Sequence, residues 1–464
     1  MLQKNQLIEL PITAISHEGD GIGRHTDGMA VFVPLTAIGD TVQVKIVKVL
    51  SRLAYGIVQD LIKPSPFRTR QQCPVFERCG GCSLRHISYE QELEVKEGWL
   101  RDNLARIGGV TIALDPAIRA PQPDRYRNKA QYPVRLVDGK IQTGFFAKRS
   151  HRMLPIKDCL LQPAFFAAVC EALTDHMEQH RISAYNEETH TGLVRNLFIR
   201  YAQATAEAMV CLVLNGKAMP HAEDLYQRLA AVCPGAVNFI ININTARTNV
   251  ILGDKNQILY GQESITDELC GVRLRLSPHS FYQVNREAAQ LLYHAALEYA
   301  APKPDDLLVD LYCGAGAIGL FMASIAGTVI GVEVVPQAVE NARQNAELGG
   351  IGNARFVCGD ASQAVKELRA QEINPDIVVV DPPRKGLEPD VIACIGELSP
   401  HKVVYISCNS ATLARDCKLF AKIGYQVQRA RAVDLFPRTA HVEAVVLLSK
   451  LKSTTPIAVK IDLD

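Results

Sequence analysis

From about residue 285 to residue 450, short apolar segments alternate with helical stretches, and this alternation constrains the fold more than any other feature. Near-continuous apolar strands separated by helices are typical of a parallel sheet that is covered on both faces. In such a sheet, ligands bind beyond the carboxyl ends of the strands. The predicted strands cover residues 307–313, 328–335, 354–360, 376–383, 402–408 and 443–450.

The rest of the chain divides into two further parts, because 464 residues exceed the length of one ordinary domain. Residues 1–62 alternate apolar and polar positions between glycine-containing turns and predict a small antiparallel β-barrel of the oligonucleotide-binding type. Residues 63–265 predict a central α+β domain, and residues 266–464 hold the α/β, Rossmann-like domain. We also expect helices at 89–109 and 163–181, and no chemistry is evident in the tail 453–464.

The charge balance excludes a uniformly basic protein that coats nucleic acid, because 50 Lys and Arg oppose 49 Asp and Glu. Positive charge is concentrated in residues 119–157, which hold ten Lys or Arg and two Asp. We interpret this segment as a nucleic-acid contact; a solvated surface is the alternative. No apolar run reaches the length of a membrane helix, and no secretion signal accompanies the thirteen cysteines. We therefore expect a cytoplasmic enzyme with reduced thiols and no obligate protein partner.

A glycine-rich turn follows the first predicted strand of the C-terminal domain, in the sequence DLYCGAGAIGL (310–320). Such a turn lets the backbone approach a ligand closely, and Glu333 at the end of the next strand suits ribose hydroxyls. These two features are shared by dinucleotide and adenosylmethionine enzymes. Asp360 near an adenine edge and Asp381 before two prolines favour a methyl-donor enzyme.

A nucleophile and a base are predicted at two further strand ends. Cys408 follows the fifth strand and precedes a helix start, a position that stabilises a thiolate. Glu443 opens the last strand and is either an exposed strand end or a partly buried general base, and His441 is a rival base two residues earlier. We interpret four other cysteines of this domain as core packing: Cys313, Cys358, Cys394 and Cys417.

Three cysteines, Cys73, Cys79 and Cys82, lie close together in CPVFERCGGC. Their spacing brings three thiolates onto one loop, and Cys159 is the best candidate for a fourth. The pattern predicts a metal site. It does not distinguish zinc from an iron–sulfur cluster.

Together, these motifs resemble the RNA uracil-5-methyltransferases that use S-adenosylmethionine. The resemblance spans almost the whole chain and includes an N-terminal TRAM domain, the cysteine cluster and the segments SFYQVN, DLYCGAG, DPPRKG, SCN and FPRT-x-HVE. It implies that Cys408 is the nucleophile, that Glu443 is the base, and that the helix at 89–109 packs on the C-terminal domain. It further implies a [4Fe–4S] cluster on Cys73, Cys79, Cys82 and Cys159, and cofactor contacts from Gln283, Tyr312, Glu333, Asp360 and Asp381.

By the same resemblance, the expected reaction is methyl transfer to C5 of a uridine in 23S ribosomal RNA, since barrel and cluster together favour ribosomal over transfer RNA. A transfer-RNA uridine is the alternative substrate. A folate- and flavin-dependent methylase is disfavoured because the first 60 residues hold no dinucleotide fingerprint. A different class of protein, a non-catalytic RNA-binding iron–sulfur redox sensor, predicts that Cys408 is dispensable.

Overall fold

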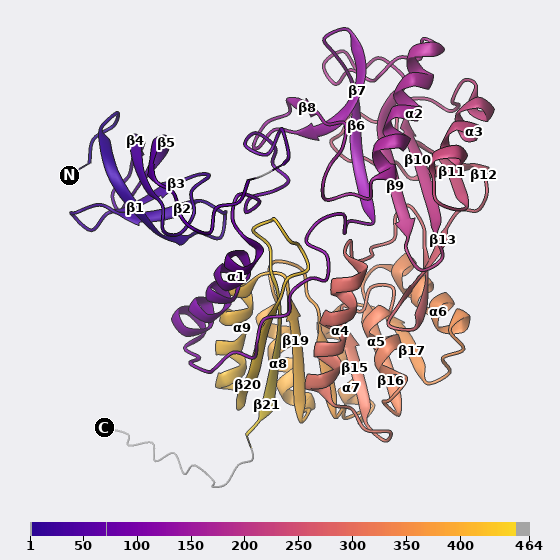
Figure 1. The fold of residues 1–464 in the computed structure, drawn as a ribbon. Helices are drawn as coiled ribbons and strands as arrows, with labels where there is room; N and C mark the ends of the chain where they lie inside the picture. The colour runs from indigo at the N-terminus through magenta and orange to yellow at the C-terminus, as the bar shows by residue number, and fades with distance from the viewer. Residues whose placement is uncertain (1, 71, 452–464) are drawn as a thin grey trace.

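The computed structural model describes residues 2–70 and 72–451, so the predicted tail 453–464 lies outside the described residues. Three bodies follow one another along the chain, as Figure 1 shows. The first is a closed barrel with the strand order β1-β2-β3-β5-β4, in which β1 and β4 pair and close the sheet. All its pairings are antiparallel except β3 with β5, which are parallel. Its strands are β1 (Leu7–Ile15), β2 (Gly21–Arg24), β3 (Ala30–Val33), β4 (Thr41–Val49) and β5 (Leu53–Lys63).

The central body is a seven-stranded sheet in the order β12-β11-β10-β9-β6-β7-β8, with two helices on one face. The helix expected at 163–181 is present as α2 (Phe165–Gln179), and the second is α3 (Ala222–Val232). The opposite face of the sheet shares a hydrophobic core with the C-terminal domain. The strands are β6 (Lys129–Val137), β7 (Lys140–Phe146), β8 (Met153–Pro155), β9 (Val194–Ala202), β10 (Glu207–Leu214), β11 (Val237–Ile243) and β12 (Lys255–Tyr260).

A hairpin leads from the central body into the C-terminal domain, whose sheet has the order β17-β16-β15-β18-β19-β21-β20. All six predicted strands are present. The hairpin is β13 (Ile265–Leu269) and β14 (Val272–Leu276), and the sheet contains β15 (Leu307–Leu311), β16 (Thr328–Glu333), β17 (Ala354–Cys358), β18 (Ile377–Val380), β19 (Lys402–Ser407), β20 (Tyr425–Val433) and β21 (Glu443–Lys450).

One part of the sheet prediction is wrong: the sheet is not parallel throughout. The strands from β17 to β19 are parallel, but β21 runs antiparallel to both β19 and β20. The physical reason is that β20 connects directly to β21 without a crossover helix, and a parallel pair needs such a crossover. β20 itself was not among the predicted strands.

Helices cover both faces of this sheet. One face packs against α4 (Arg286–Ala300), α5 (Ala317–Met322) and α6 (Pro336–Leu348), and the other against α7 (Ala361–Ala370), α8 (Pro389–Leu398) and α9 (Ser410–Lys422). The strand order reverses beside β15, which is the position where open α/β sheets bind ligands. No helix of residues 2–70 and 72–451 has the length and apolar character needed to span a bilayer.

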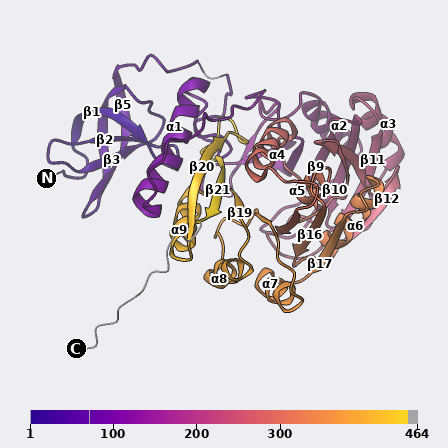
Figure 2. The same ribbon diagram turned by 90° about the horizontal axis from the view of Figure 1, so that it is seen from below.

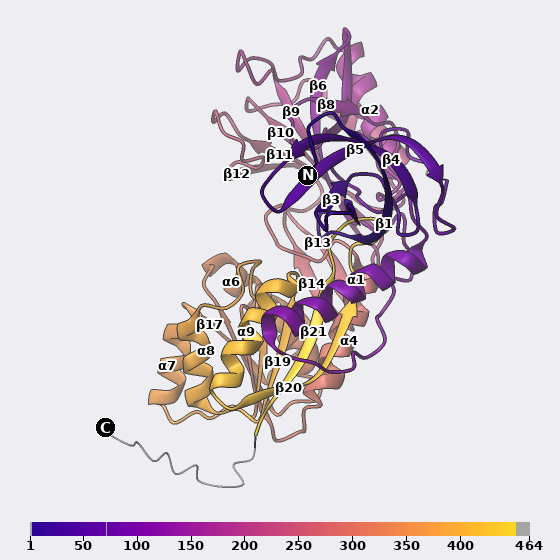
Figure 3. The same ribbon diagram turned by 90° about the vertical axis from the view of Figure 1, so that its left-hand side faces the viewer.

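An early helix completes the C-terminal domain. α1 (Tyr89–Asn103) continues into the π-helical turn η1 (Leu104–Gly108), and both lie against α9, as Figures 1 and 3 show. Trp99, Leu100 and Leu104 are buried in the same core as α8 and α9. Trp99 also donates its Nε1–H to the carbonyl of Ile15 at 2.8 Å, which ties the barrel to this helix. In Figure 2, α1 accordingly lies between the barrel and β20.

Candidate active site and cysteine loop

The strand reversal brings the proposed nucleophile and base together. Cys408 directly follows β19, whose last residue, Ser407, is opposite Ala444 in the ladder with β21. Because β21 runs antiparallel to β19, its first residue, Glu443, lies at the edge where the parallel strands end. In the parallel sheet that we expected, Glu443 would have been at the opposite edge. Asp381, which directly follows β18, belongs to the same edge.

Glu443 is a buried carboxyl rather than an exposed strand end. Its residue is 4% exposed, and burial together with the nearby Asp381 raises its pKa to about 8. Burial also raises the pKa of Asp381 to about 7. Both acids thus titrate near neutral pH, which is the range in which a carboxyl serves well as a general base.

The rival base, His441, has a different environment. Its Nε2 lies 3.4 Å from Nη2 of Arg384. Its pKa is lowered to about 4, first by desolvation and then by the cations Arg384 and Lys96. The imidazole is therefore neutral at physiological pH but a weaker base than Glu443.

The expectation that the helix start stabilises a Cys408 thiolate is wrong in this structure. The pKa of Cys408 is raised by burial first, and then by Glu443 and Asp381, while Arg384 opposes the shift. The amides at the start of α9 are already used, because the side chain of Asn409 accepts from the N–H groups of Ala411 and Thr412. The thiol therefore needs a proton acceptor before it becomes a nucleophile.

The glycine-rich turn lies beside these groups, between β15 and α5. Tyr312, Gly314 and Gly316 have φ of 66°, 54° and 82°, so the chain enters the left-handed region three times within five residues. Glu333 is half-buried and holds the turn, because its Oε2 accepts from the N–H of Gly314 at 3.2 Å. Its Oε1 accepts from the N–H of Val335 at 2.9 Å. The Glu333 carboxylate therefore lies at the glycine-rich turn.

Three other predicted cofactor residues differ in how deeply they are buried. Tyr312 is half-buried, and burial raises its pKa to about 12. Gln283 is buried, and its backbone carbonyl oxygen accepts a hydrogen bond from Asn128 Nδ2 at 2.9 Å. Asp360 is exposed, and its carboxylate caps α7 by accepting from Ser362 and Gln363.

Sequence reasoning missed Asp310 as a site residue. This last-but-one residue of β15 is fully buried, and its Oδ2 accepts from the N–H of Gly319 at 2.9 Å. Within the described part of the chain its Oδ1 has no hydrogen-bond partner, and burial raises the pKa of the carboxyl to about 8. The signal that could have found it is an acid in an otherwise apolar strand, directly before the glycine turn.

The four predicted metal ligands lie around one cavity. Cys73, Cys79, Cys82 and Cys159 all line a space of about 180 Å³, together with apolar side chains and two arginines, Arg85 and Arg127. The thiols are close enough to influence one another, since Cys79 and Cys159 raise the pKa of Cys82, whose main shift, to about 11, comes from burial. The structure thus brings Cys159 to the loop that carries the other three.

The basic segment 119–157 forms β6, β7, β8 and their connections, and part of its charge is paired. Arg125 contacts Asp158 at 2.6 Å, and Arg149 contacts Glu18 of the barrel at 2.7 Å. Lys129 is half-buried, and its pKa is lowered to about 8, first by burial and then by Arg200 and Arg127. The segment is therefore partly a structural junction as well as a cationic surface.

Comparison with known proteins identifies the family. Residues 88–451 match the tRNA (uracil-5-)-methyltransferase family, and residues 2–58 match the TRAM domain. Two proteins described as uncharacterised RNA methyltransferases, from Halalkalibacterium halodurans and Clostridium tetani, are 40% and 37% identical over 448 residues. They cover 96% and 97% of this chain, and 98% and 97% of their own lengths are matched.

A solved structure has the same architecture. The tRNA (uracil-54, C5)-methyltransferase of Pyrococcus abyssi, in complex with S-adenosyl-L-homocysteine, superposes with a TM-score of 0.76 at 26% identity, over 95% of this chain and 100% of that chain. The sequence comparison and the structural comparison agree on the family. The chain belongs to the tRNA (uracil-5-)-methyltransferase family and is an S-adenosylmethionine-dependent RNA (uracil-5-)-methyltransferase with an N-terminal TRAM domain.

Proposed function

We propose that the enzyme methylates C5 of a uridine in 23S ribosomal RNA through a covalent adduct of Cys408 with C6 of the base. The observation that carries this proposal is that Cys408 directly follows β19 and Glu443 begins the neighbouring antiparallel strand β21, with Ser407 opposite Ala444. C5 of uracil is a weak nucleophile, and a thiol that adds to C6 makes C5 electron-rich. S-adenosylmethionine supplies the methyl group when it is bound.

The residues then divide the reaction between them. Cys408 gives its proton to solvent, and the thiolate sulfur bonds to C6 while the electrons of the C5–C6 double bond move towards C5. C5 then forms its bond to the transferred methyl group. Glu443 removes the remaining proton from C5, the C5–C6 double bond re-forms, and the thiolate leaves. A carboxyl with a pKa of about 8 suits this late step, because it takes up a proton readily. The target uridine must be unpaired or flipped out of its stack to reach a site at the strand ends.

The cofactor contacts are proposed as Gln283, Tyr312, Glu333, Asp360 and Asp381. The half-buried Glu333 carboxylate beside the N–H of Gly314 supports a ribose contact at the glycine turn. The buried Asp381 follows its strand at the same edge and is followed by two prolines, which fix its backbone. Asp360 is the weakest of the five because its carboxylate already caps α7.

We propose that the cysteines hold a [4Fe–4S] cluster. The placement of all four thiols around one cavity of about 180 Å³ supports this proposal. Cys73, Cys79, Cys82 and Cys159 would be the four ligands that such a cluster needs.

The choice of ribosomal RNA rests on the combination of the TRAM barrel with the cysteine loop. Transfer RNA is the second candidate, favoured by the Pyrococcus abyssi structure, which is named as a transfer-RNA enzyme and matches along its full length. We place the enzyme in the cytoplasm, where thiols stay reduced. The non-catalytic sensor is retained only as the alternative that a dispensable Cys408 would support.

A covalent trap tests the mechanism and the substrate. Protein and S-adenosylmethionine are mixed with 5-fluorouridine-substituted 23S ribosomal RNA or transfer RNA and analysed on a denaturing gel. Fluorine cannot be removed from C5 as a proton, so the adduct should persist with the wild type and be absent with Cys408→Ala. A band with transfer RNA alone would overturn the ribosomal assignment. No band with either RNA would overturn the Cys408 mechanism.

A further inference from the structure

The segment that leads into Glu443 is held from four distant parts of the chain. Residues 434–442 connect β20 to β21, and four successive carbonyl oxygens of this connection accept hydrogen bonds from outside it. The donors are Asn285 Nδ2 to Leu435 (3.1 Å), Lys96 Nζ to Phe436 (3.1 Å), the hydroxyl of Tyr126 to Pro437 (3.0 Å), and the N–H groups of Ser83 and Leu84 to Arg438 (2.9 and 3.0 Å). We call residues 434–442 the base segment.

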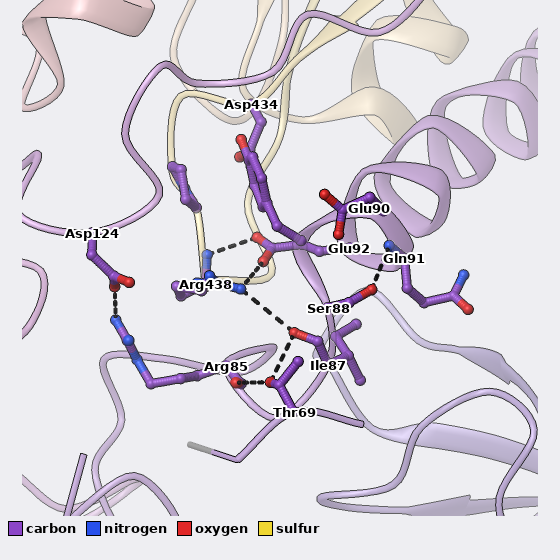
Figure 4. A network of polar contacts seen from close by, with 12 residues as sticks. Thr69, Arg85, Ile87, Ser88, Glu90, Gln91, Glu92, Asp124, Asp434 and Arg438 are labelled. Atoms are coloured by element: carbon purple, nitrogen blue, oxygen red, sulfur yellow. Dashed lines mark hydrogen bonds and ion pairs between the residues drawn. The ribbon is translucent and has the colours of Figure 1, made fainter. Parts of the chain in front are cut away.

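Buried charges from α1 form the centre of this support. Lys96 Nζ lies 2.7 Å from Glu92 Oε1 and 2.7 Å from Asp434 Oδ1, and all three residues are at most 1% exposed. Glu92 Oε1 also accepts from the backbone N–H of Arg438 at 2.7 Å, and Figure 4 shows the Glu92 carboxylate facing Arg438. One helix turn of α1 therefore contacts both ends of the bend in the base segment.

The backbone of the base segment needs this support. Arg438 has φ 69°, in the left-handed region that a side chain adopts only at a cost. Its N–H is bound by Glu92 and its carbonyl by Ser83 and Leu84, so contacts on both sides hold the bend.

Stability alone gives a poor reason for such an arrangement. Replacing a buried ion pair with apolar side chains often leaves stability unchanged or improves it, because desolvation offsets the attraction. Among the described residues, Glu92 Oε2 has only a long ion pair with Arg438 Nη1, at 3.7 Å, so part of its desolvation cost is not offset. This network costs folding free energy, and its contacts converge on the base segment. We therefore interpret it as a means of fixing the conformation of that segment.

We propose that Lys96, with Glu92 and Asp434, is a positioning residue that sets the base segment so that the Glu443 carboxylate faces C5 of the bound uridine. The inference rests on the proposed function and adds residues to it that belong to neither the cofactor site nor the nucleophile. It also gives the cysteine loop a connection to catalysis, because Ser83 and Leu84 directly follow Cys82 and bind the same bend.

The test exploits the order of the proposed steps. Glu443 acts only after the methyl group has been transferred, so an enzyme with a misplaced Glu443 stalls as a covalent protein–RNA adduct on ordinary uridine RNA. The variants are Lys96→Met and, as a milder change that keeps Lys96 paired with Glu92, Asp434→Asn. Glu443→Gln is the reference for a missing base. The matched control is Arg101→Met, which removes an exposed partner of Glu97 on the same helix.

We expect Lys96→Met to accumulate the adduct on ordinary RNA, as Glu443→Gln does, with turnover reduced by at least about tenfold. The yield of the 5-fluorouridine adduct and the affinity for S-adenosylmethionine should equal those of the wild type, because neither depends on Glu443. Asp434→Asn should show the same pattern more weakly, and Arg101→Met should behave as the wild type. Asp434→Asn decides the question if Lys96→Met does not fold.

Two results would overturn the inference while leaving the proposed function intact. In the first, Glu443→Gln accumulates the adduct but Lys96→Met and Asp434→Asn turn over like the wild type. In the second, both variants lose turnover and 5-fluorouridine trapping together, which is the signature of a purely structural role. If Glu443→Gln itself accumulates no adduct, the proposed role of Glu443 fails and the inference fails with it.

Discussion

Replacing Glu443 with Gln should stabilise the folded protein increasingly as the pH rises. In the folded chain, burial and Asp381 raise the pKa of Glu443 from 4.5 to about 8. The folded state therefore holds this proton more tightly than the unfolded state does. Between these two pKa values the unfolded chain has lost the proton and the folded chain has kept it, so the free energy of unfolding falls as the pH rises.

The size of the effect follows from the same two values. A shift from 4.5 to about 8 corresponds to a loss of about 5 kcal/mol in the free energy of unfolding once the pH exceeds both values. About 2 kcal/mol of this loss is already present near pH 6, so about 2.5 kcal/mol develops between pH 6 and pH 8.5. A buried glutamine side chain has a cost of its own, but that cost does not depend on pH.

Denaturant unfolding of the wild type and of Glu443→Gln at pH 6 and pH 8.5 gives the free energy of unfolding of both proteins, and no RNA is needed. The stability of the variant relative to the wild type should increase by about 2.5 kcal/mol between the two conditions. Glu340→Gln on α6 is the matched control, because Glu340 is an exposed acid whose removal should give the same difference at both pH values. A pH-independent difference for Glu443→Gln would show that Glu443 is not a buried, proton-holding carboxyl, and the assignment of the base would lose its physical ground.

Three further predictions follow from individual contacts. Gly331→Ala should weaken S-adenosylmethionine binding in calorimetry, because its added Cβ would lie 2.5 Å from Phe356 behind the glycine turn; unchanged affinity would contradict this packing. Trp99→Phe should lower the free energy of unfolding by about 1 kcal/mol in denaturant titration, since it removes the hydrogen bond to Ile15; a neutral change would mean that this bond does not hold the barrel. Cys159→Ala should lose bound iron and visible absorbance on anaerobic reconstitution while S-adenosylmethionine still binds; retained iron would exclude Cys159 as a ligand.

Much of the fold was predictable because each strand carries its own local signal. The six apolar segments of the C-terminal domain became strands, and the N-terminal segment became a closed barrel. The barrel is not antiparallel throughout as predicted, because β3 and β5 pair in parallel. β20 was missed because its sequence, YQVQRARAV, is interrupted by charged residues that sit on an edge strand. Without β20 the direction of β21 could not be predicted, since direction depends on the connection and not on the strand itself.

Candidate site residues could be chosen from the sequence, but their electrostatics could not. Cys408, Glu443 and Asp381 could be chosen because strand ends are readable from the sequence. The pKa of Cys408 could not, because it depends on which groups share the edge and on Asn409 occupying the helix amides. The buried network around Lys96 was equally unreadable, because Lys96 and Asp434 lie 338 residues apart and look like ordinary solvent-exposed charges in the sequence.

The electrostatics of this edge impose an order on the proposed reaction. Ionised Glu443 and Asp381 each raise the pKa of Cys408, so a thiolate and two carboxylates are not stable there together. With pKa values of about 8 and about 7, the two acids can remain protonated while the thiolate forms and attacks. When sulfur bonds to C6, the negative charge moves onto the uracil ring, and it is neutralised when C5 bonds to the methyl group. After that step the cost of ionising Glu443 falls. The closeness of Glu443 to Cys408 therefore opposes ionisation of Glu443 before the thiolate attacks. It allows ionisation of Glu443 after the adduct has formed, which is when the C5 proton is removed.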